Sequence, residues 1–288
     1  MTRSPLLASA AVAAAITTTV AGRAWAAPAQ SRRPTHLVVV GGGDPPAAAM
    51  ARFVEWAGGR QARLLVVPWA SGEPKESCET LVAELRALGP GSVECAPGTV
   101  LDAKGRAAPL EPERRRECLS LLARATGVFF TGGDQARVMD VLADAALLQA
   151  MRARYAEGAV FGGTSAGAAI MSPLMITGEG DFTVIDGAQV DTRPGLGLLE
   201  GVVVDQHFVK RQRENRLFGL VLMHPELRGI GVDEGTALLV TGGRRAEVVG
   251  PGPVMLVDAT GPDCLAIGLL RSGQTIDLSD SPGAKTTR

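Results

Sequence analysis

Short apolar runs alternate with longer amphipathic stretches from residue 36 to about residue 170. The stretches after the first, second and third runs predict helices that end near residues 57, 88 and 126. The runs themselves predict strands at residues 37–40, 64–67, 92–95, 127–130 and 158–161, the third being the weakest. Repeated apolar strands joined by helices indicate an α/β fold with a parallel, doubly wound sheet.

Past residue 236 the pattern changes to short apolar runs separated by Gly and Pro. These runs are residues 237–240, 246–249, 254–257 and 265–270. They predict an antiparallel extension of the same sheet. Residues 34–288 are therefore expected to form a single domain, with the last dozen or so residues loosely held.

The turns that follow the predicted parallel strands are rich in Gly and polar residues. Ligands of doubly wound sheets bind beyond the carboxyl ends of the strands, which is where these turns lie. The turns are Gly41–Asp44, Pro68–Ser71, Thr131–Gln135 and the segment after residue 161. The sequence therefore predicts a ligand site at this edge of the sheet.

Residues 1–26 predict an export signal rather than part of the fold. Arg3 gives a positive start, residues 6–20 are apolar, and Ala24-Trp25-Ala26 fits a cleavage site. The apolar stretch is too short and too weakly apolar for a lasting membrane span. We expect cleavage near Ala26, a linker at residues 27–33, and a periplasmic or secreted mature protein that does not contact the membrane.

Composition and charge narrow the function classes. The chain has 288 residues, of which 46% are hydrophobic, and this is enough for one large core. The net charge of −1 gives no basic field, so nucleic-acid binding is not indicated.

The chain has four cysteines, Cys78, Cys95, Cys118 and Cys264. An even number permits disulfides in an exported protein, and four cysteines allow three connectivities. Their spacings match no metal-binding motif, and a domain of this size does not need disulfides to fold. If one bridge forms, Cys95–Cys118 is the pair we consider first.

Ser165 stands in a Gly-x-Ser-x-Gly pattern, Gly163 to Gly167, between a predicted strand and a helix-favouring run. A serine on such a strand–turn–helix junction is typical of a nucleophile elbow, where the backbone is strained and the neighbouring residues must be small. The alternative is a Gly-rich turn whose serine only caps a helix. The position at the ligand-binding edge favours the nucleophile.

A nucleophilic serine needs a base, and the chain has three histidines. His36 begins the first strand, at the opposite end of the sheet from Ser165. His224 precedes Pro225 where a helix stops, as a cap or surface residue would. His207 leaves an apolar strand for a loop, so it is the histidine best placed to reach Ser165.

The imidazole in turn needs a carboxylate to hold its tautomer and charge. Asp205 is two residues from His207, Glu234 ends another predicted strand, and Asp181 lies in a loop after the elbow. Sequence spacing leaves all three open. Near them, Arg211, Arg213 and Arg216 fall at the start of a predicted helix, where each cation costs about 0.3–1 kcal/mol against the helix dipole. They form either a solvated face or a site for substrate carboxylates.

Four segments together resemble the cyanophycinases, which belong to the serine peptidase family that also contains aspartyl dipeptidase. The segments are Thr131–Gln135, the Gly162–Ala169 elbow, Asp205–Phe208 with its trailing arginines, and Gly231–Glu234. The resemblance covers about residues 36–270. It implies a flavodoxin-like fold related to the class I glutamine amidotransferases, with a C-terminal antiparallel extension. It also implies a serine hydrolase without metal or cofactor, which could be a homodimer.

The resemblance also implies roles for residues. Ser165 would be the nucleophile, His207 the base and Glu234 its partner, with Asp181 as the alternative because aspartyl dipeptidases take this residue from a loop just past the elbow. The N–H groups of Gly133 and Ala166 would form the oxyanion hole. The residues that match the substrate pocket are Gln135, Asp205, Gln206, Arg211, Arg213 and Arg216.

The implied substrate is cyanophycin, a poly-aspartate whose side chains carry arginine, and the implied products are β-aspartyl-arginine dipeptides. Trp69, where relatives tend to have a small polar residue, and the two prolines after Asp44 depart from the pattern and bear on the substrate. The other hypotheses are an aspartyl or isoaspartyl dipeptidase, an esterase using Ser165, Asp181 and His207, and an exported binding protein without turnover. A glutamine amidotransferase would require Cys at position 165.

Overall fold

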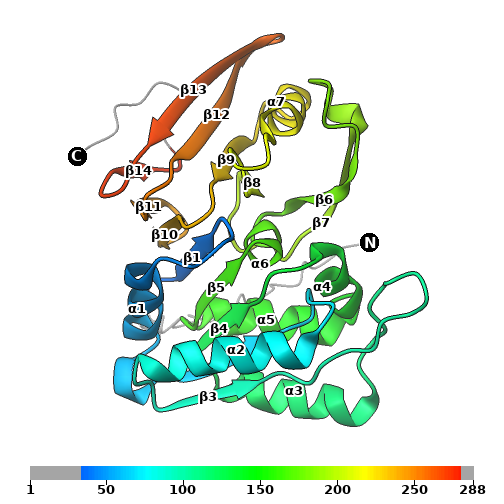
Figure 1. The fold of residues 1–288 in the computed structure, drawn as a ribbon, viewed down its shortest axis with the longest axis vertical. Helices are drawn as coiled ribbons and strands as arrows, with labels where there is room; N and C mark the ends of the chain where they lie inside the picture. The colour runs from blue at the N-terminus through cyan, green and yellow to red at the C-terminus, as the bar shows by residue number, and fades with distance from the viewer. Residues whose placement is uncertain (1–33, 280–288) are drawn as a thin grey trace, which may run out of the picture. The chain divides into compact units, whose positions relative to one another are not determined.

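The computed structural model describes residues 34–279, and its centre is an eight-stranded sheet in the order β14-β11-β10-β1-β5-β4-β2-β3 (Figure 1). The first five strands in chain order run parallel to one another, and the last three are antiparallel. The parallel strands are β1 (His36–Val40), β2 (Arg63–Val67), β3 (Ser92–Cys95), β4 (Gly127–Phe130) and β5 (Val160–Thr164). The antiparallel strands are β10 (Ala237–Thr241), β11 (Arg245–Val249) and β14 (Thr275–Asp277). The predicted α/β class and the mostly parallel sheet are confirmed.

Helices cover both faces of this sheet. Successive strand residues point to opposite faces, and those on both faces are apolar. One core contains Val38 and Val40 of β1 and packs under α1 (Ala47–Trp56) and α2 (Pro74–Ala87). The other core contains Leu37 and Val39. The helices on that side are α3 (Pro112–Arg124), α4 (Gln135–Val141) and α5 (Ala145–Ala156). The helices therefore cover the faces of the sheet, and the turns after the strands lie at the carboxyl ends of the parallel strands.

The prediction of one extended sheet is wrong for part of the C-terminal region. Strands β12 (Val254–Gly261) and β13 (Cys264–Leu270) do not join the main sheet but form a four-stranded sheet, β13-β12-β9-β8. Its other members are β8 (Val202–Gln206) and β9 (Arg228–Val232). Val254 of β12 is buried in the large core, whereas Val257 is buried in a separate core with α7 (Glu214–Met223). Strand β12 is therefore buried on both faces, between two cores, as a member of this second sheet.

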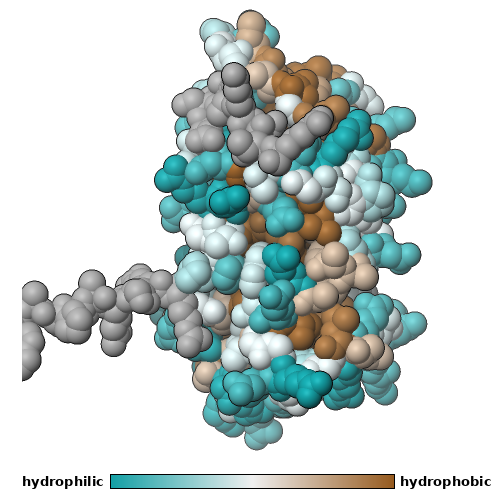
Figure 2. All heavy atoms as spheres, turned by 90° about the vertical axis from the view of Figure 1, so that its left-hand side faces the viewer, coloured by the Kyte–Doolittle hydropathy of each residue, from teal (hydrophilic) through white to brown (hydrophobic). Residues whose placement is uncertain are grey.

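Two further elements complete the described chain. A β-hairpin of β6 (Leu174–Gly180) and β7 (Val190–Pro194), with a short 3-10 turn η2 (Gly187–Gln189) between them, follows the elbow and was absent from the sequence prediction. The β12–β13 hairpin forms the upper end of Figure 1, and Figure 2 shows hydrophobic residues near the upper end of the side it views. Ile267 and Leu269 of the edge strand β13 are 50% and 51% exposed.

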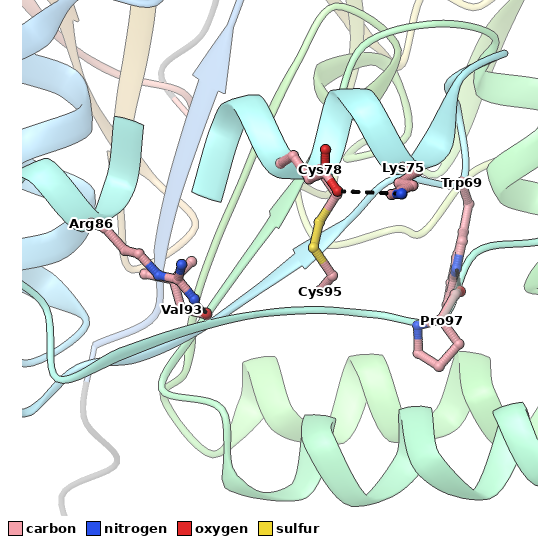
Figure 3. Close-up of a disulfide and its surroundings, with 8 residues drawn as sticks. Trp69, Lys75, Cys78, Arg86, Val93, Cys95 and Pro97 are labelled. Carbon is pink, nitrogen blue, oxygen red and sulfur yellow. Dashed lines mark hydrogen bonds and ion pairs between the residues drawn. A yellow bond between two sulfur atoms is a disulfide. The ribbon is translucent and has the colours of Figure 1, made fainter. Parts of the chain in front are cut away.

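The disulfide joins Cys78 to Cys95, so the Cys95–Cys118 pairing is wrong (Figure 3). Val93 and Cys95 alternate with Glu94 on β3, and therefore share one face of the sheet. Val93 packs in the core under α2, which carries Cys78. Cys118 lies buried on α3, on the opposite face, and is a free thiol, as is the exposed Cys264.

The predicted signal peptide and linker lie outside the described residues. Within residues 34–279 no helix combines the length and the apolar character that crossing a membrane requires.

Candidate active site

Ser165 sits at a strained turn between β5 and a single helical turn, α6 (Ala166–Ala169). Its backbone has φ 53° and ψ −113°, in a region that L-residues rarely adopt. The flanking glycines are required by packing. A Cβ on Gly163 would lie 2.4 Å from the carbonyl of Gly167, and a Cβ on Gly167 would lie 2.6 Å from the Phe130 oxygen. The strand–turn–helix context predicted for the elbow is present, with a helix of only four residues.

His207 contacts Ser165 directly. Its Nε2 lies 2.8 Å from Ser165 Oγ, and its Nδ1 lies 2.5 Å from Glu234 Oε1. His207 follows β8 immediately, and its N–H donates to Gly41 O at 2.6 Å, so the ring is held above the end of β1. The hydroxyl, imidazole and carboxylate therefore form one connected chain of hydrogen bonds, contributed by the segments after β5, β8 and β9.

The two other candidate carboxylates are engaged elsewhere. Asp181 accepts hydrogen bonds from the N–H and the hydroxyl of Thr183, at 2.9 and 2.6 Å. Asp205 is buried and pairs with Arg216 through both of its oxygens. Of the three carboxylates left open by the sequence, only Glu234 reaches His207. The other two histidines lie where expected, His36 at the start of β1 and His224 after the last residue of α7.

The turn after β4 brings backbone N–H groups next to the serine. A Cβ on Gly132 would lie 3.4 Å from Ser165 Cβ and 3.9 Å from its Oγ. Within residues 34–279, the N–H groups of Gly133 and Ala166 donate to no other group of the protein. Unpartnered backbone donors beside a nucleophile are the feature that an oxyanion hole requires.

Comparison with known proteins agrees with this arrangement. The family model of peptidase family S51 matches residues 37–248. The chain belongs to peptidase family S51. It is a serine peptidase similar to the cyanophycinase of Geminocystis herdmanii, with 37% identity over 210 residues, which are 73% of this chain and 74% of that protein. The cyanophycinase of Trichormus variabilis is also 37% identical, over 71% of this chain and 66% of its own length. The chain spans 62% of the cyanophycinase of Thermosynechococcus vestitus, at 36% identity over 73% of this chain.

Two solved structures share the fold. A peptidase from an acI-B1 actinobacterium superposes with a TM-score of 0.64 and 23% identity, covering 86% of this chain and 98% of that one. A putative peptidase E from Listeria monocytogenes superposes with a TM-score of 0.50 and 15% identity, covering 76% of this chain and 100% of that one. The fold is that of the S51 peptidase E proteins, which is similar to the class I glutamine amidotransferases.

The six predicted pocket residues of this S51 peptidase divide into two groups. Gln206, Arg211 and Arg213 lie at the site. Gln206 Oε1 is 3.4 Å from Ser165 Oγ, and Arg213 Nη1 donates to Gln206 O at 2.8 Å. Arg211 is exposed next to His207. The sequence suggested that the three arginines share the start of one helix. They do not, because α7 begins only at Glu214.

Gln135, Asp205 and Arg216 form the second group and lie behind the pocket surface. Asp205 and Arg216 are each 1% exposed and form a buried ion pair. The guanidinium carbon of Arg216 lies 4.8 Å from the centre of the Phe182 ring, on the loop after β6. Gln135 is buried and donates to Ile176 O at 2.8 Å. All three side chains are buried, and their part in substrate binding stays a prediction. Trp69 is fully buried as well, and donates to Pro97 O at 2.9 Å, so it contributes no pocket surface.

The electrostatics of the site keep the imidazole neutral and favour an anion nearby. Burial, together with the charges of Arg211 and Arg213, lowers the pKa of His207 below the ordinary value, and the hydrogen bond that His207 donates to Glu234 opposes this shift. The hydrogen bond to His207 lowers the pKa of Glu234, so that group remains a carboxylate. Burial beside Arg216 lowers the pKa of Arg213 to about 10. No three His, Cys, Asp or Glu side chains within residues 34–279 are grouped so that they could hold a metal ion.

The direction of the His207 shift predicts the acid limb of the pH profile. A general base acts in its neutral form, so kcat/KM falls as pH drops through its pKa. Because the pKa of His207 is lowered from 6.5, the midpoint of the acid limb is expected below pH 6.5. Replacing Arg211 with Gln removes a charge that lowers this pKa, and should move the midpoint to higher pH. A limb above pH 6.5 in the wild type, or a shift to lower pH in the variant, would contradict this assignment.

Proposed function

We propose that this S51 peptidase hydrolyses a cyanophycin-type polymer, a poly-aspartate with arginine on its side chains, and releases β-aspartyl-arginine dipeptides. The observation that carries the proposal is the His207 ring bonded to both Ser165 and Glu234, in a chain that is similar to cyanophycinases. The activity of the whole protein is a proposal because the chain spans only 62–74% of the length of these relatives.

The proposed reaction begins with proton transfer from Ser165 Oγ to His207 Nε2. The oxygen attacks the carbonyl of a backbone aspartyl peptide bond, and the resulting oxyanion accepts hydrogen bonds from Gly133 and Ala166 N–H. His207 then gives its proton to the leaving amine, and an acyl-enzyme remains. Water, deprotonated by His207, attacks the acyl-enzyme and regenerates the Ser165 hydroxyl. Glu234 stabilises the protonated ring in both halves of the reaction.

The charge of the site supports an arginine-bearing substrate of this type. Each side chain of the polymer ends in a free carboxylate and a guanidinium. Arg211 and Arg213, at the site surface, can bind the carboxylate, which guanidinium groups bind in paired hydrogen bonds. Gln206 lies between Arg213 and Ser165, where its amide can meet a substrate amide.

The test is product analysis. Purified protein is incubated with insoluble cyanophycin, and the soluble products are identified by mass spectrometry, with the Ser165→Ala variant as the blank. We expect β-aspartyl-arginine as the main product. If cyanophycin is left intact while N-terminal aspartyl or isoaspartyl dipeptides are cleaved, the chain is a dipeptidase of the same family. A protein that cleaves neither, and does not react with a fluorophosphonate at Ser165, is a binding protein.

We also propose that the peptidase acts outside the cytoplasm, on the basis of residues 1–26. Expression of the full chain in a bacterial host, followed by fractionation and N-terminal sequencing, checks this. We expect a periplasmic or extracellular product that begins near residue 27. A cytoplasmic product that retains Met1 would refute export.

A further inference from the structure

The turn that carries Gly133 rests on the loop after β2. Asp134 N–H donates to Ala70 O at 2.8 Å, and a Cβ on Gly133 would lie 2.1 Å from the same oxygen and 3.0 Å from Ser71 Cα. Gly133 has φ +135°, and only glycine can approach another backbone this closely. The direction of the Gly133 N–H is therefore set by where Ala70 and Ser71 lie.

That loop is fixed by α2. The Ser71 hydroxyl lies 2.6 Å from the Ser77 hydroxyl and accepts a hydrogen bond from Glu73 N–H at 3.0 Å. Ser71 is 7% exposed, and both contacts are partly buried. The first turn of α2 and the loop before it are therefore hydrogen-bonded into one unit.

The disulfide connects this unit to the sheet. Cys78 follows Ser77 on α2, and its partner Cys95 is the last residue of β3. Two residues past Cys95, the Pro97 carbonyl accepts a hydrogen bond from Trp69, on the same loop as Ala70 (Figure 3). The Cys78–Cys95 bond and the Trp69–Pro97 hydrogen bond thus link the end of β3 to the loop that the Gly133 backbone approaches.

We propose that the Cys78–Cys95 disulfide and Ser71 are positioning groups for the oxyanion-hole N–H of Gly133, so that turnover depends on the oxidation state of the disulfide. The inference rests on the proposed catalytic role of Gly133. Oxyanion donors act only within a few tenths of an ångström of their working position, so a small displacement of the turn lowers the rate without unfolding the protein. Reduction by a phosphine breaks the S–S bond and leaves two thiols. The phosphine supplies two electrons, and water supplies the two thiol protons. The oxygen atom of that water is transferred to the phosphine, which leaves as phosphine oxide.

The experiment measures kcat, KM and the rate of fluorophosphonate labelling of Ser165 before and after reduction of the native protein with a phosphine. We expect kcat and the labelling rate to fall together by about tenfold, with KM changed by less than twofold. Reoxidation should restore both. The Cys78→Ala/Cys95→Ala variant should show the lowered rates without any response to reductant, and Ser71→Ala should show a similar loss of kcat.

Cys264→Ser is the matched control, because Cys264 is exposed and unpaired, and this variant should behave as the wild type in every measurement. Thiol titration verifies that the bridge has been reduced. Unchanged kcat and labelling in the reduced protein, or a loss confined to KM, would overturn the inference. If the double variant does not fold, reduction of the wild type decides the question. If the wild type leaves cyanophycin intact, the proposed substrate is wrong, and the labelling rate still tests the positioning role.

Discussion

Replacing Gly42 with Ala is expected to lower kcat by about 10⁴-fold, the size of loss that follows when the catalytic imidazole is present but wrongly oriented. A Cβ at this position would lie 2.2–2.7 Å from three atoms of the His207 ring. The ring cannot retreat freely, because His207 has φ +49°, a strained conformation, and its N–H is bonded to Gly41 O. The variant must therefore move the imidazole off the line between Ser165 and Glu234.

The matched control for this prediction is Gly58→Ala. Gly58 follows α1, at the far end of the sheet from the site, and has φ +115°, close to the +106° of Gly42. A Cβ added to Gly58 would have its nearest neighbour 3.6 Å away, which is an ordinary contact. Both variants carry the same kind of backbone strain, so thermal unfolding of Gly58→Ala should report the loss of stability from strain alone, and Gly42→Ala should lose more because of its clash with His207. Steady-state kinetics should show the large loss of kcat only for Gly42→Ala. Equal activity in the two variants would show that the Gly42 contact does not hold the base in place.

Ser165 and His207 could be predicted from the sequence because each directly follows an apolar strand. The two strands, β5 and β8, lie in different sheets, and the hydrogen bond from His207 N–H to Gly41 O after β1 brings the ring next to Ser165. The choice of carboxylate depends on pairing between distant strands. Gln206 of β8 is level with Val232 of β9, and this register puts Glu234 beside His207. No local pattern specifies that register, so Asp181 and Asp205 remained equally open.

Two errors share a physical cause, which is the face on which a residue lies. The Cys95–Cys118 pairing took no account of the face of the sheet on which each cysteine lies, and alternation on β3 directs Cys95 toward α2. Arg211 and Arg216 were treated alike, although Arg211 precedes α7 and is exposed, and Arg216 lies within α7 and is buried against Asp205. In both cases the deciding contact is made by another element of the fold, which is α2 for Cys95 and β8 for Arg216.

Replacing Glu234 with Gln is expected to lower kcat by about 10⁴-fold while leaving the fold intact. The carboxylate accepts the Nδ1 proton of His207 at 2.5 Å, which fixes the tautomer with Nε2 facing Ser165 and stabilises the ring when it is protonated. A neutral amide loses the charge and can also present its NH₂ group, which would favour the wrong tautomer. Because the hydrogen bond to Glu234 raises the pKa of His207, its removal should also move the acid limb of kcat/KM to lower pH.

Asp181→Asn is the matched control for Glu234→Gln, because it also replaces a carboxylate with its amide. Within residues 34–279 the Asp181 carboxylate accepts hydrogen bonds only from Thr183, in its own loop, so this variant should keep kcat within about twofold of the wild type and leave the pH profile unchanged. Steady-state kinetics across pH 4–8 for both variants separate the two candidate triads, because only the true partner of His207 can change both the rate and the apparent pKa. A collapse of kcat in Asp181→Asn with retention in Glu234→Gln would require the loop after β6 to move and deliver Asp181 to the ring. The triad would then be the one that this family's aspartyl dipeptidases use. The opposite result ties catalysis to the β8–β9 register that the structure already displays.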